Sequence, residues 1–205
     1  LPVPLDACAF DPAPAAIRNA LYDRLGFVEL LSADGATIAC EVCETDAALD
    51  AVLGKLTGLV AMHALVEDNE KLAGFAFTDG KTCGYSKLTP RLGAWLADAS
   101  AQKIAHHVEG MVVALHRAGV QRAGLVADSA AASHLTQPSN WAPNDLPVVA
   151  KHALGRALPE EDKVRGVGRM RKAWSELPAE RAAEFAALHA TAALEIWNKL
   201  SPAIE

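Results

Sequence analysis

The sequence predicts an α/β or α+β fold: a mixed sheet with two Asp-Gly hairpins, packed by a long helix and followed by a helical C-terminal part. Two features carry this prediction. Asp34-Gly35 and Asp79-Gly80 each separate two short apolar runs, and this dipeptide favours the tight turn of a β-hairpin. Residues 89–119 and 178–200 instead place apolar side chains at the spacing of an amphipathic helix.

Cap and turn residues predict where the helices before residue 89 begin and end. Asp11-Pro12 opens a helix that Gly26 ends, and Thr45 caps a second helix that reaches about Leu56. Apolar runs predict strands at residues 27–32, 36–43, 72–77 and 82–86. Residues 59–66 fit either a strand or a helix, and we favour a strand.

One long helix is expected across residues 89–119, with Thr89 as its N-cap. A helical wheel places His106 and Glu109 on its polar side and His107 at the edge of its apolar side. We therefore expect His107 to point inward. His106 and Glu109 then form either a weak surface pair or part of a metal site, although two ligands are too few for a closed zinc site.

Further elements follow toward the C-terminus. They are a strand at residues 120–127, a short helix capped by Asp128 or Ser129, a proline-rich loop at 136–147, and helices at 147–154 and 178–200. We expect an α/β domain at residues 1–135 and a mostly helical region, packed on it, at residues 136–205.

The order of elements up to Gly119 is helix, two strands, helix, three strands, helix. With the two Asp-Gly turns, this order resembles that of profilin-like and roadblock-type sensor or scaffold domains. The resemblance covers roughly the first 119 residues and implies a fold rather than a function.

Composition narrows the expected partners. The chain has 205 residues, a net charge of −6 and 51% hydrophobic residues. The negative charge argues against nucleic acid and against an anionic membrane surface as partners. No apolar run is long enough to span a membrane, and the first residues show no signal-peptide pattern. We expect a soluble, cytoplasmic protein.

Cys40 and Cys43 have the C-x2-C spacing of some metal and redox sites. The residues around them alternate as in a strand, so the two thiols should face opposite sides of a sheet. No second cysteine or histidine pair completes a zinc site. We expect packing thiols and no metal, with metal and redox roles as alternatives.

Residues 163–172 are the densest basic run. We predict an anion-binding segment made of Arg165, Gly166, Gly168, Arg169 and Arg171, because glycines let the backbone approach an anion that guanidinium groups clamp. A charge-balanced surface loop is the structural alternative. The segment has no Walker A pattern.

Three residues are candidates for catalysis: His107, Asp128 and His189. Asp128 ends a predicted strand where an α/β sheet often binds its ligand, but it also suits a helix cap. His189 lies on the apolar face of the last helix, either as a core residue or in a pocket shared with His107.

No recognised catalytic signature joins these residues. We therefore expect a ligand-binding, scaffold or accessory-subunit protein. The alternative is a small-molecule enzyme that uses buried histidines and grips an anionic substrate with the arginine-glycine segment. The partners we expect are a small anionic ligand or a protein, and the sequence leaves the cofactor and any homo-oligomer open.

Overall fold

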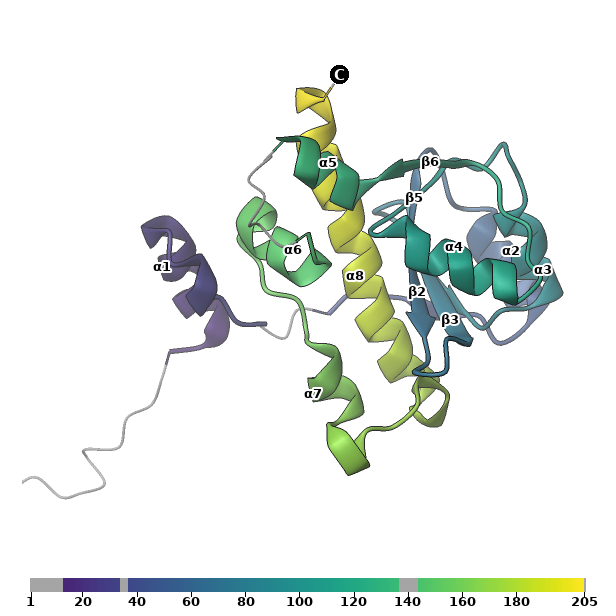
Figure 1. Cartoon of the computed structure of the whole chain (residues 1–205), viewed down its shortest axis with the longest axis horizontal. Helices are drawn as coiled ribbons and strands as arrows, with labels where there is room; N and C mark the ends of the chain where they lie inside the picture. The colour runs from purple at the N-terminus through teal and green to yellow at the C-terminus, as the bar shows by residue number, and fades with distance from the viewer. Residues whose placement is uncertain (1–12, 34–36, 137–143, 205) are drawn as a thin grey trace, which may run out of the picture.

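A six-stranded mixed sheet lies at the centre of the structure, and a long C-terminal helix crosses one of its faces (Figure 1). This computed structural model describes residues 13–33, 37–136 and 144–204. The strands are β1 (Glu41–Val42), β2 (Val60–Val66), β3 (Leu72–Thr78), β4 (Cys83–Ser86), β5 (Lys103–Ala105) and β6 (Leu125–Asp128). The α-helices are α1 (Ala15–Leu25), α2 (Asp46–Leu53), α3 (Pro90–Leu96), α4 (Val108–Arg117), α5 (Ser129–Thr136), α6 (Leu146–Leu154), α7 (Glu161–Arg165) and α8 (Ala179–Leu200). The predicted fold class, a mixed sheet packed by helices, is confirmed.

The strand order is β1-β4-β3-β2-β5-β6. Strands β2, β3 and β4 form an antiparallel meander, whereas β5 and β6 run parallel to β2 on its other side. The hairpin predicted around Asp79-Gly80 is confirmed. Asp79 Oδ1 accepts the backbone N–H groups of Lys81 and Thr82 at 2.9 and 2.8 Å, and Gly80 takes the positive φ that the turn needs.

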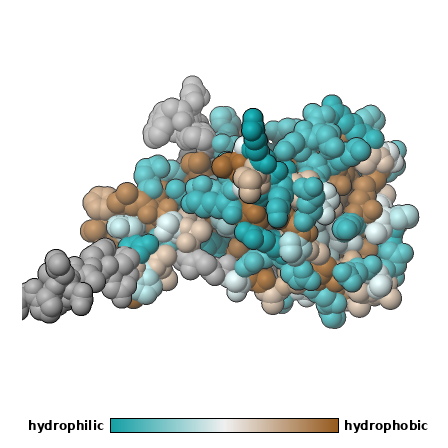
Figure 2. Space-filling model, turned by 90° about the horizontal axis from the view of Figure 1, so that it is seen from below, coloured by the Kyte–Doolittle hydropathy of each residue, from teal (hydrophilic) through white to brown (hydrophobic). Residues whose placement is uncertain are grey.

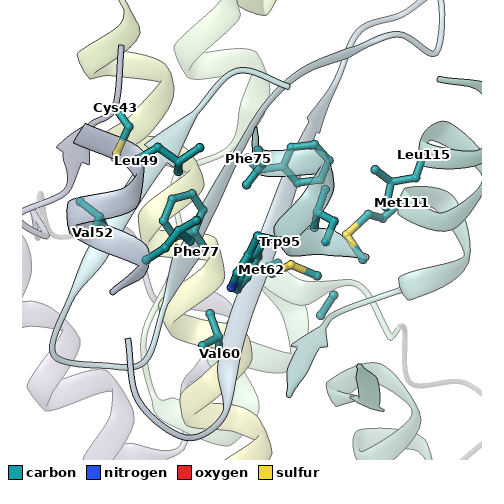
Figure 3. Packing of buried hydrophobic residues seen from close by; sticks show 14 residues of the cluster. Cys43, Leu49, Val52, Val60, Met62, Phe75, Phe77, Trp95, Met111 and Leu115 are labelled. Atoms are coloured by element: carbon teal, nitrogen blue, oxygen red, sulfur yellow. The ribbon is translucent and has the colours of Figure 1, made fainter. Parts of the chain in front are cut away.

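The two faces of the sheet carry different cores because side chains alternate along each strand. On β2, Val60 and Met62 pack with Phe77 and with residues of α2, α3 and α4 (Figure 3). The alternate β2 residues face α8 instead: Ala61 packs with Leu194 and Leu65 with Phe185. Helices α5 and α6 pack against α8 from its other side (Figure 1).

The cysteine prediction follows the same alternation. Cys43 lies in the core beneath α2, α3 and α4, whereas Cys40 packs with Cys83 on the side of α8. The two thiols of the C-x2-C spacing therefore face opposite sides, as expected.

The single helix predicted across residues 89–119 is wrong. Thr89 does cap a helix, but α3 ends at Leu96 and β5 follows, between β2 and the edge strand β6. Lys103 belongs to this strand and is fully buried, with its ammonium group donating to the carbonyl oxygens of Asp98, Ala101 and Ala123. These hydrogen bonds connect residues up to twenty apart, so helical spacing alone could not reveal them. The helical wheel for His106 and His107 loses its basis.

The first predicted hairpin is also not found as expected. Residues 28–30 form a 3₁₀ turn instead of a strand, and β1 pairs parallel to β4. The side chain of Asn19 in α1 donates to Ser32 O at 2.6 Å and accepts Ser32 N–H at 3.1 Å, so it takes hydrogen bonds that a strand partner would have made. Asp34-Gly35 lies outside the described residues.

The remaining predicted helices are confirmed with small shifts at their ends: α1, α2, α5, α6 and α8. Strand β6 is shorter than expected and begins at Leu125. Within the described ranges, no helix is both long and apolar enough to cross a membrane. Helix α1 projects from the body, and apolar side chains are visible on this projection in Figure 2.

Candidate functional site

The sheet changes direction of growth between β2 and β5. Strands β3, β4 and β1 lie on one side of β2, and β5 and β6 lie on the other side. In open α/β sheets, ligands bind beyond the carboxyl ends of the parallel strands at such a switch point. Strands β2, β5 and β6 are parallel, and we call the edge of the sheet at their carboxyl ends the carboxyl edge.

Two histidine side chains, His63 from β2 and His189 from α8, lie against each other between the sheet and this helix. The rings of His63 and His189 lie 4.9 Å apart, and Phe185 stacks on His189 at 4.0 Å. His189 Nδ1 lies 2.8 Å from Phe185 O, and a carbonyl oxygen can only accept, so Nδ1 carries the proton. Burial lowers the pKa of His189 to about 4, and burial beside the other imidazoles lowers the pKa of His63 well below its ordinary value. Both rings are therefore neutral at pH 7.

His106, at the end of β5, is also neutral. Its Nε2 lies 2.6 Å from Asn144 O and must donate to it, so Nδ1 accepts the hydroxyl of Ser129 at 2.9 Å. Burial lowers the pKa of His106 despite the bond to Asn144. Ser129 itself is fully buried, so this serine–histidine pair is closed to a substrate.

Asp128 caps the N-termini of two helices, α4 and α5. Its carboxylate accepts the backbone N–H groups of His107, Val108 and Ala130 at 3.1, 3.0 and 2.8 Å. These bonds fix the first turns of α4 and α5, as the capping interpretation of the sequence requires.

The structure brings two of the three predicted catalytic residues into contact, because Asp128 accepts the backbone N–H of His107, but the His107 side chain points elsewhere. His107 is 42% exposed, and its Nδ1 lies 3.3 Å from Glu109. His189 is buried as predicted, but its neighbour is His63, which the sequence analysis missed. Strand alternation over residues 59–66 was the available signal, because it puts His63 on the same face as Ala61 and Leu65. The catalytic role of His107, Asp128 and His189 stays a prediction.

Two of the three arginines of the predicted anion segment, Arg165 and Arg171, already have carboxylate partners. The guanidinium of Arg165 is 1% exposed, lies over the Trp174 ring, and pairs with Asp68 at 3.1 Å and with Glu161. Arg171 pairs with Glu161 at 2.5 Å and with Asp162 at 2.6 Å.

The rest of the predicted segment lies at the surface. Arg169 is exposed, while Gly166 and Gly168 take positive φ angles. Anion binding by the segment also stays a prediction, and Arg169 is its most accessible cation.

A groove of about 810 Å³ adjoins this segment just beyond the carboxyl end of β2, the part of the carboxyl edge farthest from β6. Its walls come from the turn between β2 and β3, from the residues after β4 and from the segment after α7. Lys71 and Lys87 line it and are exposed, and within the described residues neither has an ion-pair partner.

Solved structures of several nucleic-acid enzymes share this fold. Pol1 from M. smegmatis, solved with DNA primer-template and dNTP, matches with a TM-score of 0.61 at 22% identity, over 80% of this chain. Trypanosoma brucei RNase D in complex with RNA U12 matches with a TM-score of 0.63 at 19% identity, over 78% of this chain. Brucella melitensis NrnC with bound Mg²⁺ matches with a TM-score of 0.59 at 18% identity, over 80% of this chain.

The chain spans only part of some of these proteins. It covers 27% of the M. smegmatis polymerase chain and 62% of the T. brucei RNase D chain, but 78% of the NrnC chain. No curated protein matches the sequence.

The acids at the carboxyl edge do not fit a Mg²⁺ ion such as the one in NrnC. Mg²⁺ requires several oxygen ligands in octahedral geometry, and here the carboxylates of Glu67, Asp68 and Asp128 are already engaged. Glu67 accepts the N–H groups of Trp174 and Ser175 at 2.9 Å, Asp68 pairs with arginines, and Asp128 accepts three N–H groups. In the part of the chain that the structure covers, no three His, Cys, Asp or Glu residues are grouped to hold a metal ion.

The sequence model of the family described as "DNA polymerase I, ribonuclease H-like domain" matches residues 64–196. This match corrects the expected function, because a nuclease-type domain is neither a ligand-binding scaffold or accessory subunit nor an enzyme for small molecules. It also overturns the exclusion of nucleic acid as a partner and the resemblance to profilin-like domains. Net charge misled because it averages over the whole surface, whereas binding of nucleic acid depends on the charges of one local surface. Well over half of the residues are matched, and the chain belongs to the family of DNA polymerase I ribonuclease H-like domains.

Proposed function

We propose that this chain is the exonuclease-fold domain of a DNA polymerase I-type protein and that it binds a single DNA strand across the carboxyl edge. The family match carries the proposal, because residues 64–196 include β5, β6, α8 and the walls of the groove. DNA is the first choice of strand because the family is that of a DNA polymerase. The bound nucleic acids of the M. smegmatis and T. brucei structures support a nucleic-acid partner.

The groove supports the proposal chemically. Phosphates need cations that are not already paired, and Lys71 and Lys87 meet this condition where Arg165 and Arg171 do not. The carboxylates of Glu67 and Asp68 lie in the same groove but are held by backbone N–H groups and arginines, which reduces their repulsion of a phosphate. We also expect a cytoplasmic location, as for a protein that works on DNA.

Fluorescence anisotropy with an end-labelled single-stranded DNA oligonucleotide tests the proposal. We expect saturable binding that weakens with salt. The double change Lys71→Ala/Lys87→Ala should weaken it several-fold and lower the salt slope by about 1 to 2, since each phosphate contact releases about one counterion.

Lys55→Ala/Lys81→Ala is the matched control. It removes the same charge from two exposed lysines that do not line the groove. Equal loss in both double variants would mean that net charge, and not the groove, governs binding. A single-stranded RNA of the same sequence shows whether the site prefers DNA.

A further inference from the structure

We infer that the carboxyl edge of this chain does not hold Mg²⁺ and that it binds a strand through its own side chains alone. The inference rests on the proposed function for its strand and on the geometry of the edge for its lack of a metal. Nucleases commonly cut phosphodiesters with two metal ions about 4 Å apart, each held by carboxylates. The described residues of this edge offer no such set.

Three of the acids near the edge already have a task in the fold, and the other two, Glu109 and Asp145, are exposed beside His107 and His106. Asp128 fixes the starts of α4 and α5, and Glu67 fixes the turn that contains Trp174. Asp68 joins the β2–β3 turn to Arg165 and Arg171. A cation would have to share these oxygens with the backbone N–H and guanidinium groups that hold them, and the side chains are oriented by those groups and not toward a common centre.

Imidazoles occupy the place nearest the switch point. His63 and His189 face each other at 4.9 Å between β2 and α8, and Leu65 is the next β2 residue on that face. Neutral imidazole suits zinc and copper, whereas Mg²⁺ takes oxygen ligands. Phe185 and Leu65, both buried, complete an apolar environment that disfavours a divalent ion.

Mn²⁺ titration of the full chain, followed by the electron paramagnetic resonance of the free ion, tests the inference without nucleic acid. Mn²⁺ prefers the same oxygen ligands as Mg²⁺. We expect no saturable site below about 1 mM, the weak end of protein affinities for hard cations. Strand affinity should agree within about twofold between Mg²⁺ and EDTA at equal ionic strength.

The double variant His63→Asp/His189→Asp should gain a saturable Mn²⁺ site, because two carboxylates would then face each other across the 4.9 Å gap. The control His116→Asp/His152→Asp adds the same charge at exposed positions on different helices and should gain none. If this double variant folds but gains no Mn²⁺ site, the two imidazoles are not what keeps a divalent ion from this place, and that part of the inference is overturned. If that variant does not fold, the titration of the natural chain still decides.

A saturable Mn²⁺ site in the natural chain would overturn the inference, as would Mg²⁺-dependent shortening of the oligonucleotide that His63→Ala removes. Absence of strand binding in both Mg²⁺ and EDTA would instead defeat the proposed function. The Mn²⁺ titration contains no strand, so the two failures are distinguishable.

Discussion

Two clusters of ionisable side chains include residues that are close in the chain, His63 in one and Glu67 and Asp68 in the other. The first cluster is neutral, whereas the second is charged. His63, inside β2, joins His189 in an aromatic cluster where burial keeps the imidazoles neutral. Four to five residues later, Glu67 and Asp68 enter a fully ionised cluster around Arg165. The difference teaches that burial alone does not decide the charge state. A buried group stays charged where opposite charges surround it, and becomes neutral where only aromatic and apolar groups do.

The largest effect should come from the ionised cluster. Arg165→Met should lower the free energy of unfolding by about 3 kcal/mol, because it leaves the nearly buried Glu67 without its cation, and Asp68 and Glu161 with Arg171 alone. Urea denaturation at pH 7 measures this loss. Arg169→Met, at an exposed position in the same segment, should change stability by no more than about 0.5 kcal/mol. A small effect at Arg165 would show that solvent already screens these carboxylates.

The neutral cluster should reveal itself through pH. The pKa of His189 is about 4 in the folded chain and 6.5 ordinarily, so the unfolded chain binds the proton first as pH falls. Stability is therefore retained above pH 6.5 and lost between pH 6.5 and 4. From pH 7 to 5 the loss from His189 should be about 2 kcal/mol.

His189→Gln separates this loss from that of other groups. The Gln amide can still donate a hydrogen bond but does not titrate in this range, so the variant should lose less stability between pH 7 and 5. Parallel pH profiles for the natural chain and the variant would mean that the pKa of His189 is the same in the folded and the unfolded chain.

A smaller difference is expected between the adjacent histidines after β5. His106→Ala should cost about 1–2 kcal/mol, because it removes hydrogen bonds to Ser129 and Asn144, and Ser129 is buried. His107→Ala should cost no more than about 0.5 kcal/mol, since its ring is half-exposed. Chemical denaturation of the two variants compares them directly. The opposite order would restore the helical-wheel interpretation of the sequence.

The sequence allowed the local half of the structure to be predicted. Thr45 and Thr89 cap helices as expected, and Asp79-Gly80 makes its hairpin, because these signals act over a few residues. It could not reveal β5, whose buried Lys103 finds its carbonyl partners at Asp98, Ala101 and Ala123.

The site was less predictable than the fold for the same reason. His189 was expected in a pocket, but its neighbour His63 is 126 positions away in the chain and lies beside it only because α8 crosses β2. The arginines of the basic run were expected to meet an external anion. The carboxylates that meet Arg165 come partly from the β2–β3 turn, nearly a hundred residues earlier.

The smallest expected effect concerns an exposed ion pair, that of Lys163 with Glu160, which we compare with the buried ion pairs of Arg165. Lys163 lies two positions before Arg165 and pairs with Glu160 at 3.7 Å, but the two side chains are 76% and 65% exposed. Lys163→Met should therefore change the free energy of unfolding by no more than about 0.5 kcal/mol, and added NaCl should erase the change. Urea denaturation of Lys163→Met beside Arg165→Met, each in low and high salt, gives the contrast. If burial among carboxylates is what makes Arg165 important, only the Lys163 effect should vanish with salt. Equal salt sensitivity at both positions would mean that the cluster around Arg165 is as open to solvent as the pair on the surface of α7.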